Sequence, residues 1–281
     1  MSDTSRPRTV LDKNDVLGGL FASWDSIEAV LAGLPDDDWQ TPTALPGWTV
    51  HDVVAHMIGT ELMLSGTPTP ESEAARPDYV HNDIGALNEA WVEHLRGESP
   101  AAMLAKFREV TTRRKAALSA MPMEEWNTVT FTPAGPDSYG RFMRVRVFDC
   151  WMHENDIRDA VGRGTADDDL PGPDARLALD EMSSSMGFVV AKKGGAPDGS
   201  RVELNLTGPL ARTIRVAIDG RAAVVADFGD QQPTAAITVD GRQFVRLAGG
   251  RPMTGHAPQA IEYGGDEAVG TRIVENLAYV I

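Results

Sequence analysis

The amino-acid sequence predicts an α+β protein, with a helical N-terminal domain and a smaller C-terminal domain in which helices cover a short-stranded sheet. In the first part of the chain, apolar side chains recur three and four positions apart, which is typical of amphipathic helices. An acidic, proline-containing run at residues 165–173 ends this pattern, and short alternating runs typical of β-strands follow. We therefore place the N-terminal domain at residues 1–165 and the C-terminal domain at residues 166–281.

The N-terminal domain is predicted to be a bundle of helices. Thr49 is the expected N-cap of its second helix, and Asp52, three residues later, supplies the acidic part of a capping box. The loop before this helix carries Trp39 and Trp48, which we interpret as covers over the end of the bundle. Residues 122–140 are expected to form a loop with a short extended piece. The helical patterns lie at residues 14–34, 50–62, 84–95, 100–121 and 139–162.

The C-terminal domain combines helical patterns with short strands. A helix is predicted first, at residues 174–192, and two more follow at residues 242–248 and 266–277. Asp219 and Gly220 lie between two strand patterns and are typical of the tight turn of a β-hairpin. The predicted strands lie at residues 202–206, 214–218, 222–226 and 235–239.

The composition argues against several classes of protein. A length of 281 residues, with 42% hydrophobic and 24% charged residues, is typical of a globular protein with room for two cores. No apolar run approaches the roughly 18 residues of a membrane span, and residues 1–8 are polar, unlike a secretory signal. We therefore expect a cytoplasmic protein without membrane contact. The formal net charge of −15 argues against a nucleic-acid partner, because phosphate binding needs a basic face.

The segment at residues 149–158 is the densest in possible metal ligands. Asp149 and His153 are four residues apart, so both project from the same face of a helix. Carboxylates and imidazoles both bind zinc, and a catalytic zinc site usually takes three protein ligands. The chain has one cysteine, so any metal site has to rest on histidine, aspartate and glutamate. By itself, an acid and a histidine at this spacing are more often a surface pair than a metal site.

A third ligand has to come from elsewhere in the chain. His56 lies among the apolar residues of the second predicted helix, where a histidine is more often part of the core than a ligand. His51 lies five residues earlier and points about 140° away from it. The remaining histidines, His81, His94 and His256, are expected to be solvated, interhelical or loop residues. The pattern alone leaves the third ligand open.

Several motifs resemble a known protein family. Residues 45–50 read LPGWTV and lead into VAH at residues 54–56, and residues 151–158 read WMHENDIR. Two C-terminal patterns support them, FVRLAGGR at residues 244–251 and RIVENL at residues 272–277. On these motifs the chain resembles the mycothiol-dependent maleylpyruvate isomerase family, whose N-terminal domain is a DinB-like metal-binding four-helix bundle. The resemblance covers nearly the whole chain.

The resemblance implies a metal site and a thiol cofactor. In the family, zinc is held by one histidine from the second bundle helix and by an acid and a histidine from the last bundle helix. The matching positions in this chain are His56, Asp149 and His153. The family often has glutamate at the acid position, so the aspartate here keeps the charge but moves the carboxylate by one methylene. The implied cofactor is mycothiol or another low-molecular-weight thiol, and the implied substrate is a small electrophile. The reaction is either maleylpyruvate-type cis–trans isomerisation or thiol S-transfer, which the residues do not separate.

Further residues are candidates for supporting roles. Arg246 and Arg251, in the C-terminal pattern, are candidate anchors for an anionic substrate or for polar groups of the thiol, because a guanidinium matches a carboxylate. Solvated arginines at a helix end fit this pattern equally well. Asp156 and Arg158 are expected either to pair within the bundle or to orient His153.

Alternative functions remain open. Two alternatives to the thiol-dependent enzyme fit the sequence: a non-catalytic protein that binds a metal or a small molecule, and a DinB-like metal hydrolase that uses water. The sequence does not match a zinc protease. His153 and Glu154 begin like the zinc-protease motif, but Ile157 occupies the position of its second histidine. Cys150 lies about 100° from the face of Asp149, so we interpret it as a buried apolar residue and expect the nucleophile to come from outside the chain.

Overall fold

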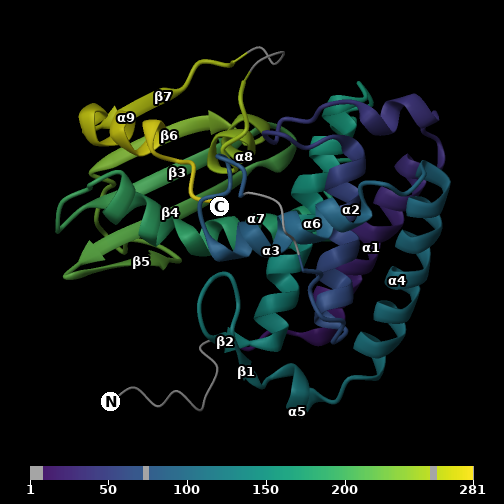
Figure 1. Ribbon diagram of the computed structural model, residues 1–281. Coiled ribbons are helices and arrows are strands. Elements are labelled where there is room, and N and C mark those ends of the chain that lie inside the picture. The colour runs from purple at the N-terminus through teal and green to yellow at the C-terminus, as the bar shows by residue number, and fades with distance from the viewer. Residues whose placement is uncertain (1–8, 72–75, 254–257, 281) are drawn as a thin grey trace. The chain divides into compact units, whose positions relative to one another are not determined.

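The computed structural model describes residues 9–71, 76–253 and 258–280 (Figure 1). The described chain divides into two compact units. The first comprises the described residues up to Thr165 together with Gly172–Ala178, and the second comprises Ala166–Pro171 with the described part of Leu179–Val280. Helix α7 (Pro173–Phe188) begins in the first unit and ends in the second. All three predicted metal ligands belong to the first unit.

Long helices form the frame of the first unit. Helices α1 (Lys13–Ala32), α2 (Val50–Leu64), α4 (Pro100–Ala120) and α6 (Tyr139–Ala160) lie alongside one another and bury their apolar stripes in a shared core (Figure 1). Helix α3 (Asp83–Leu95) packs against α2. The stripes follow the predicted spacing of three and four, which confirms the helical bundle. The largest fully buried side chains of this core include Trp24, Trp39, Phe107, Leu20, Ile27 and Met57.

The start of α2 is fixed by local contacts, which matters because α2 carries a predicted metal ligand. The side chain of Thr49 accepts a hydrogen bond from the backbone N–H of Asp52, and the Asp52 carboxylate accepts one from the backbone N–H of Thr49 at 3.0 Å. This is the predicted capping box. Just before it, Gly47 has φ 75°, and a Cβ at this position would lie 2.6 Å from the ring of Tyr79. The chain therefore enters α2 through a tightly packed turn.

The predicted loop at residues 122–140 contains more structure than expected. It holds a short helix, α5 (Met123–Trp126), and an antiparallel pair of β1 (Val129–Thr130) with β2 (Asp137–Ser138). Strands of two residues are too short to show an alternating pattern. The pair is still important for the site, because β2 ends where α6 begins and so sets the start of the helix that carries two of the predicted ligands.

The second unit contains a five-stranded sheet in the order β5-β4-β3-β6-β7. β3 and β6 are parallel, and the other neighbouring strands are antiparallel. Alternate residues of the central strands are buried on one face, among them Val202, Leu204, Ile214, Val216 and Ile237. The strands are β3 (Arg201–Thr207), β4 (Arg212–Asp219), β5 (Arg221–Val225), β6 (Ala235–Asp240) and β7 (Glu262–Gly265).

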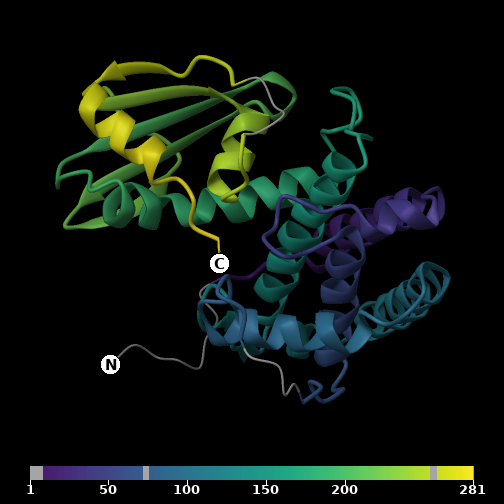
Figure 2. The same ribbon diagram turned by 45° about the horizontal axis from the view of Figure 1, so that its top comes forward.

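Helices cover the buried face of this sheet. Helices α8 (Gly241–Ala248) and α9 (Glu267–Glu275) pack on the strands from the same side (Figure 2). Phe244 of α8 is fully buried, and the opposite face carries polar pairs such as Glu203 with Arg215 at 2.8 Å. The predicted α+β class is therefore confirmed. Strand β7 was not predicted, because its sequence Glu-Tyr-Gly-Gly has no alternating apolar pattern.

Among the helices of the described residues, none is both long enough and apolar enough to cross a membrane.

Candidate metal centre

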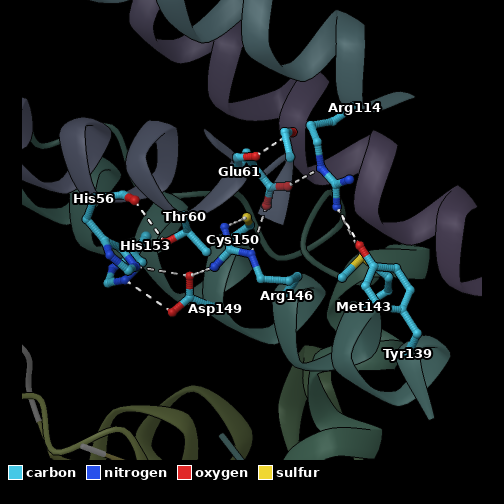
Figure 3. Close-up of polar contacts among 11 residues, drawn as sticks. His56, Thr60, Glu61, Arg114, Tyr139, Met143, Arg146, Asp149, Cys150 and His153 are labelled. Carbon is cyan, nitrogen blue, oxygen red and sulfur yellow. Dashed lines mark hydrogen bonds and ion pairs between the residues drawn. The ribbon is translucent and has the colours of Figure 1, made fainter. Parts of the chain in front are cut away.

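The three predicted metal ligands come together in the first unit (Figure 3). His56 lies on α2, and Asp149 and His153 lie one turn apart on α6; one ligand atom of each is within 4.8 Å of those of the other two. The Asp149 carboxylate lies between the imidazoles, with Oδ2 at 3.3 Å from His56 Nε2 and Oδ1 at 3.5 Å from His153 Nε2. The two rings meet edge to face, with centroids 4.9 Å apart. Two helices thus present three ligand atoms to one point.

The burial of this cluster suits a divalent ion. Both histidines are buried, whereas the side chain of Asp149 is 28% exposed, so the centre is closed toward the bundle and reachable past the carboxylate. Two imidazoles and one carboxylate are a ligand set of catalytic zinc sites, which leave a further coordination position open. The residues therefore fit zinc or a similar ion.

Asp156 orients one of the imidazoles. Its Oδ2 lies 3.1 Å from Nδ1 of His153, which leaves Nε2 of that ring directed at Asp149. A second carboxylate behind a ligating histidine fixes the ring and its tautomer. Asp156 was expected either to pair within the bundle or to orient His153, and this contact supports the second role. Arg158 instead pairs with Glu154, with 2.7 Å between Nε and Oε1.

Trp48 lies against the centre, which the sequence did not reveal. Its ring centroid is 5.4 Å from that of His56 and 6.3 Å from that of His153. The indole N–H donates a hydrogen bond to Glu89 of α3 at 3.0 Å, which holds the ring in place. Trp48 is partly buried and packs against the bundle core, as a cover would, and its ring also lies beside both histidines. Trp39 is buried in the bundle core.

A pocket adjoins this tryptophan through Glu89. It has a volume of about 570 Å³ and is lined by residues of α3 and by Thr69, Pro70, Arg76, Pro77, Tyr79 and Val80. Tyr79 lines it and donates its hydroxyl hydrogen to Glu89 at 3.1 Å, and Arg96 lines it and donates to Asp52 at 3.1 Å. Its size is in the range that holds small organic ligands.

A chain of buried charges supports the centre from inside the bundle (Figure 3). Arg146, one turn before Asp149 on α6, donates from Nη1 to Asp149 Oδ2 and from Nε to Glu61 Oε1, the latter at 2.8 Å. The other oxygen of Glu61 accepts from Nε of Arg114 at 2.8 Å, and Arg114 also donates to the hydroxyl of Tyr139 at 3.0 Å. No role at the centre was predicted from the sequence for Glu61, Arg114 or Arg146.

These charges shift the pKa values of the three ligands. Burial would raise the pKa of Asp149, but Arg146 and the two histidines outweigh burial and hold the pKa well below its ordinary value. Burial lowers the pKa of His56, and the opposing effect of Asp149 is smaller. Burial would lower the pKa of His153 too, but Asp149 and Asp156 raise it. The lowered pKa values favour an ionised Asp149 and an uncharged His56, which are the states of metal ligands, whereas the raised pKa of His153 favours its charged form, so metal binding there would release a proton.

Cys150 lies next to the centre in sequence but is closed off from it. The side chain is fully buried, and burial raises the pKa of the thiol to about 12. Nη2 of Arg146 lies 3.5 Å from the sulfur. The thiol is therefore protonated at neutral pH and unsuited to act as a nucleophile.

Arg246 and Arg251, the candidate anchors, belong to the second unit. Arg246 lies in the last turn of α8 and donates from Nη2 to the carbonyl of Pro252 at 2.7 Å. Arg251 follows that helix and donates from Nη1 to the carbonyl of Gly249 at 2.6 Å. Both guanidinium groups thus contact backbone carbonyls near the end of α8. Their role as anchors stays a prediction. His256 lies outside the described residues.

Known structures and known sequences both include proteins similar to this chain. Crystal structures of the mycothiol-dependent maleylpyruvate isomerase and of its histidine-to-alanine mutant align at 16% identity with TM-scores of 0.57 and 0.58, and cover 88% of this chain and 95% of theirs. At this identity the alignment shows a shared fold. Uncharacterised proteins of Mycobacterium tuberculosis strains CDC 1551 and H37Rv are 30% identical over 153 residues, which span 54% of this chain and 58% of theirs.

Family models match both units of the chain. The model described as the mycothiol maleylpyruvate isomerase N-terminal domain matches residues 20–158, which include the three ligands. The model described as the MDMPI C-terminal domain matches residues 176–272. Since the two models together cover most of its length, the chain belongs to the mycothiol maleylpyruvate isomerase family.

Proposed function

We propose that this protein is a metal-dependent enzyme that uses mycothiol, or another low-molecular-weight thiol, against a small electrophile. The observation that carries the proposal is the convergence of His56, Asp149 and His153 on one point of the bundle. Family membership supports the thiol, and the fold is shared with an enzyme named as a mycothiol-dependent maleylpyruvate isomerase. The reaction proposed is therefore maleylpyruvate-type cis–trans isomerisation or thiol S-transfer.

The residues of the centre have separate tasks. His56, Asp149 and His153 would hold the ion, for which zinc is the expected metal. When bound, such an ion lowers the pKa of a thiol that coordinates to it, so that thiolate is available at neutral pH. Asp156 fixes the ring of His153, and the indole of Trp48 packs against both imidazoles.

The nucleophile comes from outside the chain, because Cys150 is buried and protonated. The thiolate sulfur adds to one carbon of a conjugated double bond, and the electron pair of that bond moves into the conjugated carbonyl. The remaining single bond can then rotate. In isomerisation the electron pair returns, the carbon–sulfur bond breaks and the thiol is recovered. In S-transfer the carbon–sulfur bond remains, and a leaving group departs with its electron pair.

Metal analysis of the purified protein tests the centre. We expect about one divalent ion per chain, as in zinc sites with three protein ligands. His56→Ala, Asp149→Ala and His153→Ala should each lower this content strongly. His51→Ala is the matched control, because His51 is a second buried histidine of α2 whose Nε2 contacts the carbonyl of Glu98 at 3.0 Å. Full metal content in His153→Ala would contradict the proposal.

Thiol dependence separates the proposed enzyme from the alternatives. A panel of conjugated electrophiles, with maleylpyruvate included, is incubated with the metal-loaded protein with and without mycothiol. Turnover only with the thiol supports the proposal, and the product distinguishes isomerisation from S-transfer. Equal turnover without thiol would indicate a hydrolase. Tight metal binding without any turnover of the panel would favour a binding protein.

A further inference from the structure

Arg146 contacts both the candidate ligand Asp149 and the buried carboxylate of Glu61. Its side chain is 3% exposed, and its planar guanidinium spans the two acids, with Nη1 on Asp149 Oδ2 and Nε on Glu61 Oε1. A guanidinium has several N–H groups in one rigid plane, so it can hold two carboxylates in a fixed relation. The arginine is therefore more than a counter-ion for a single acid.

The contacts of Glu61 extend this arrangement across three helices. Glu61 lies on α2, the helix of His56, and its side chain is 2% exposed. Arg114 of α4 donates to its second oxygen, and Arg146 of α6 donates to the first. The two helices that supply the ligands are thus joined by charged hydrogen bonds within the core, beside the ligands themselves (Figure 3).

Stability alone is a weak explanation for this arrangement. A buried ion pair often stabilises a fold no better than well-packed apolar residues of the same volume would, because its charges lose their hydration. Four ionised groups in this part of the bundle are therefore expected to serve a geometric purpose. Asp149 needs such support, since its carboxylate is partly exposed and can rotate about its Cβ–Cγ bond. A bond from Arg146 to Oδ2 stops that rotation and keeps Oδ1 toward His153.

We propose that Arg146 is a positioning residue that fixes the carboxylate of Asp149 for metal binding, and that Glu61 holds Arg146 in place. The inference rests on the metal centre of the proposed function.

Arg146→Met tests this role, and Arg114→Met is its matched control. Both changes remove a buried arginine from Glu61, but only the first removes a contact to Asp149. Removal of a partner that orients a metal ligand typically weakens metal binding by about 10- to 100-fold, and we expect this loss for Arg146→Met. For Arg114→Met we expect a change of less than about threefold, because the partner of Asp149 remains.

Metal affinity is measured without reference to activity. Metal-free protein is titrated with Zn²⁺ in competition with a chromophoric chelator, and the visible spectrum of the Co²⁺ form reports the ligand geometry. Tryptophan fluorescence confirms that each variant is folded. If Arg146→Met does not fold, Arg146→Lys is the test variant, because a lysine keeps the charge but does not span both carboxylates. Arg146→Lys should weaken Zn²⁺ binding by at least about fivefold.

Several results would overturn the inference. Zn²⁺ binding by the folded Arg146 variant within about threefold of wild type, or an equal loss in Arg114→Met, would show that the arginine acts only on the fold. Tighter binding by Arg146→Met would show that the arginine competes with the ion for Asp149. Absence of binding by the wild type would overturn both this inference and the proposed function, whereas wild-type binding with unaffected variants would overturn this inference alone.

Discussion

Glu61→Gln measures how much the buried charges contribute to the stability of the bundle. We expect this change to lower the free energy of unfolding of the first unit by about 3–5 kcal/mol, the cost of removing one partner from a buried ion pair. Glu61 is bonded by Arg114 and Arg146, both of which are buried. Glutamine keeps the size of the side chain and removes its charge, so both guanidinium groups lose their shared ionic partner.

The hydrogen bonds of Glu61 give a similar value for the loss in the free energy of unfolding. Both are 2.8 Å long and join charged groups. A hydrogen bond to a charged group contributes about 1.5–3 kcal/mol, so the pair contributes about 3–6 kcal/mol. Arg146 keeps its bond to Asp149 and Arg114 keeps its bond to Tyr139, which favours the lower part of this range. Since a domain is typically stable by about 5–15 kcal/mol, such a loss is a large fraction of the total free energy of unfolding.

Tryptophan fluorescence follows the unfolding of the bundle in urea. All six tryptophans lie between Trp24 and Trp151, so the signal comes from the first unit alone. Glu154→Gln is the matched control, because Glu154 is also buried and has one arginine partner, Arg158, so its loss should be about 1.5–3 kcal/mol. A loss below about 1 kcal/mol for Glu61→Gln, at an unchanged slope with urea, would refute the reasoning.

Further changes test the nucleophile, the anchors and a pH-dependent contact. Cys150→Ala should retain turnover with added thiol, and in wild type a thiol reagent should label Cys150 only after unfolding, because the native thiol is buried with a pKa raised to about 12. Arg246→Ala or Arg251→Ala should lower kcat/KM by roughly 10- to 150-fold, equivalent to about 1.5–3 kcal/mol for a charged hydrogen bond; unchanged steady-state kinetics in both would remove them as anchors. Burial would raise the pKa of Asp137, but hydrogen bonds from the side chain and backbone of Thr9 outweigh burial and lower the pKa. The Asp137 carboxylate thus stabilises the fold above its unfolded pKa of about 3.9, and this contribution is lost as the pH falls through the lower pKa of the folded state. In urea unfolding, the difference in the free energy of unfolding between wild type and Asp137→Asn should therefore shrink from about pH 5 to about pH 3.

The helices and the proximity of one candidate ligand pair were predictable because their signals are local. The capping box of Thr49 and Asp52 involves neighbours in the sequence, and the structure forms it as expected. Asp149 and His153 share a helix face at a spacing of four residues, so their proximity follows from helix geometry. His56 was different, because its contact with Asp149 joins positions 93 residues apart. Its assignment therefore needed the family resemblance.

The buried charges left a signal that could have been used. Arg114 lies four residues after Val110 and four before Leu118, both of which are buried on α4. A charge on an apolar stripe has to be paired when the stripe is buried. Glu61 on α2 and Arg146 on α6 also lie among buried apolar residues, so three such charges could have been predicted to meet. Their individual pairing depends on how the helices pack.

Other features had no sequence signal of this kind. Trp48 reaches the histidines because Glu89 of a different helix holds its indole, and loop residues show no periodicity from which such a contact could be inferred. Strand β7 forms by pairing with β6, with Tyr263 opposite Ile237, although its own sequence is rich in glycine. In both cases tertiary contacts determine the local conformation.

The charges around the centre are consistent with an anionic thiol as the ligand. Glu61 and Asp149 carry two negative charges, Arg114 and Arg146 carry two positive charges, and these cancel. Asp156, which lies 3.1 Å from His153, adds one further negative charge. With both imidazoles uncharged as metal ligands, these five groups sum to −1, although the whole chain carries −15. A bound divalent ion would therefore leave one positive charge for an anion to compensate, and a thiolate is such an anion. If the arginines were absent, the carboxylates alone would outweigh the charge of the ion, and an incoming thiolate would gain less. In the function that we propose, the arginine that directs Asp149 would thus also keep the bound metal electrophilic, which connects the buried network in the bundle core to the proposed chemistry.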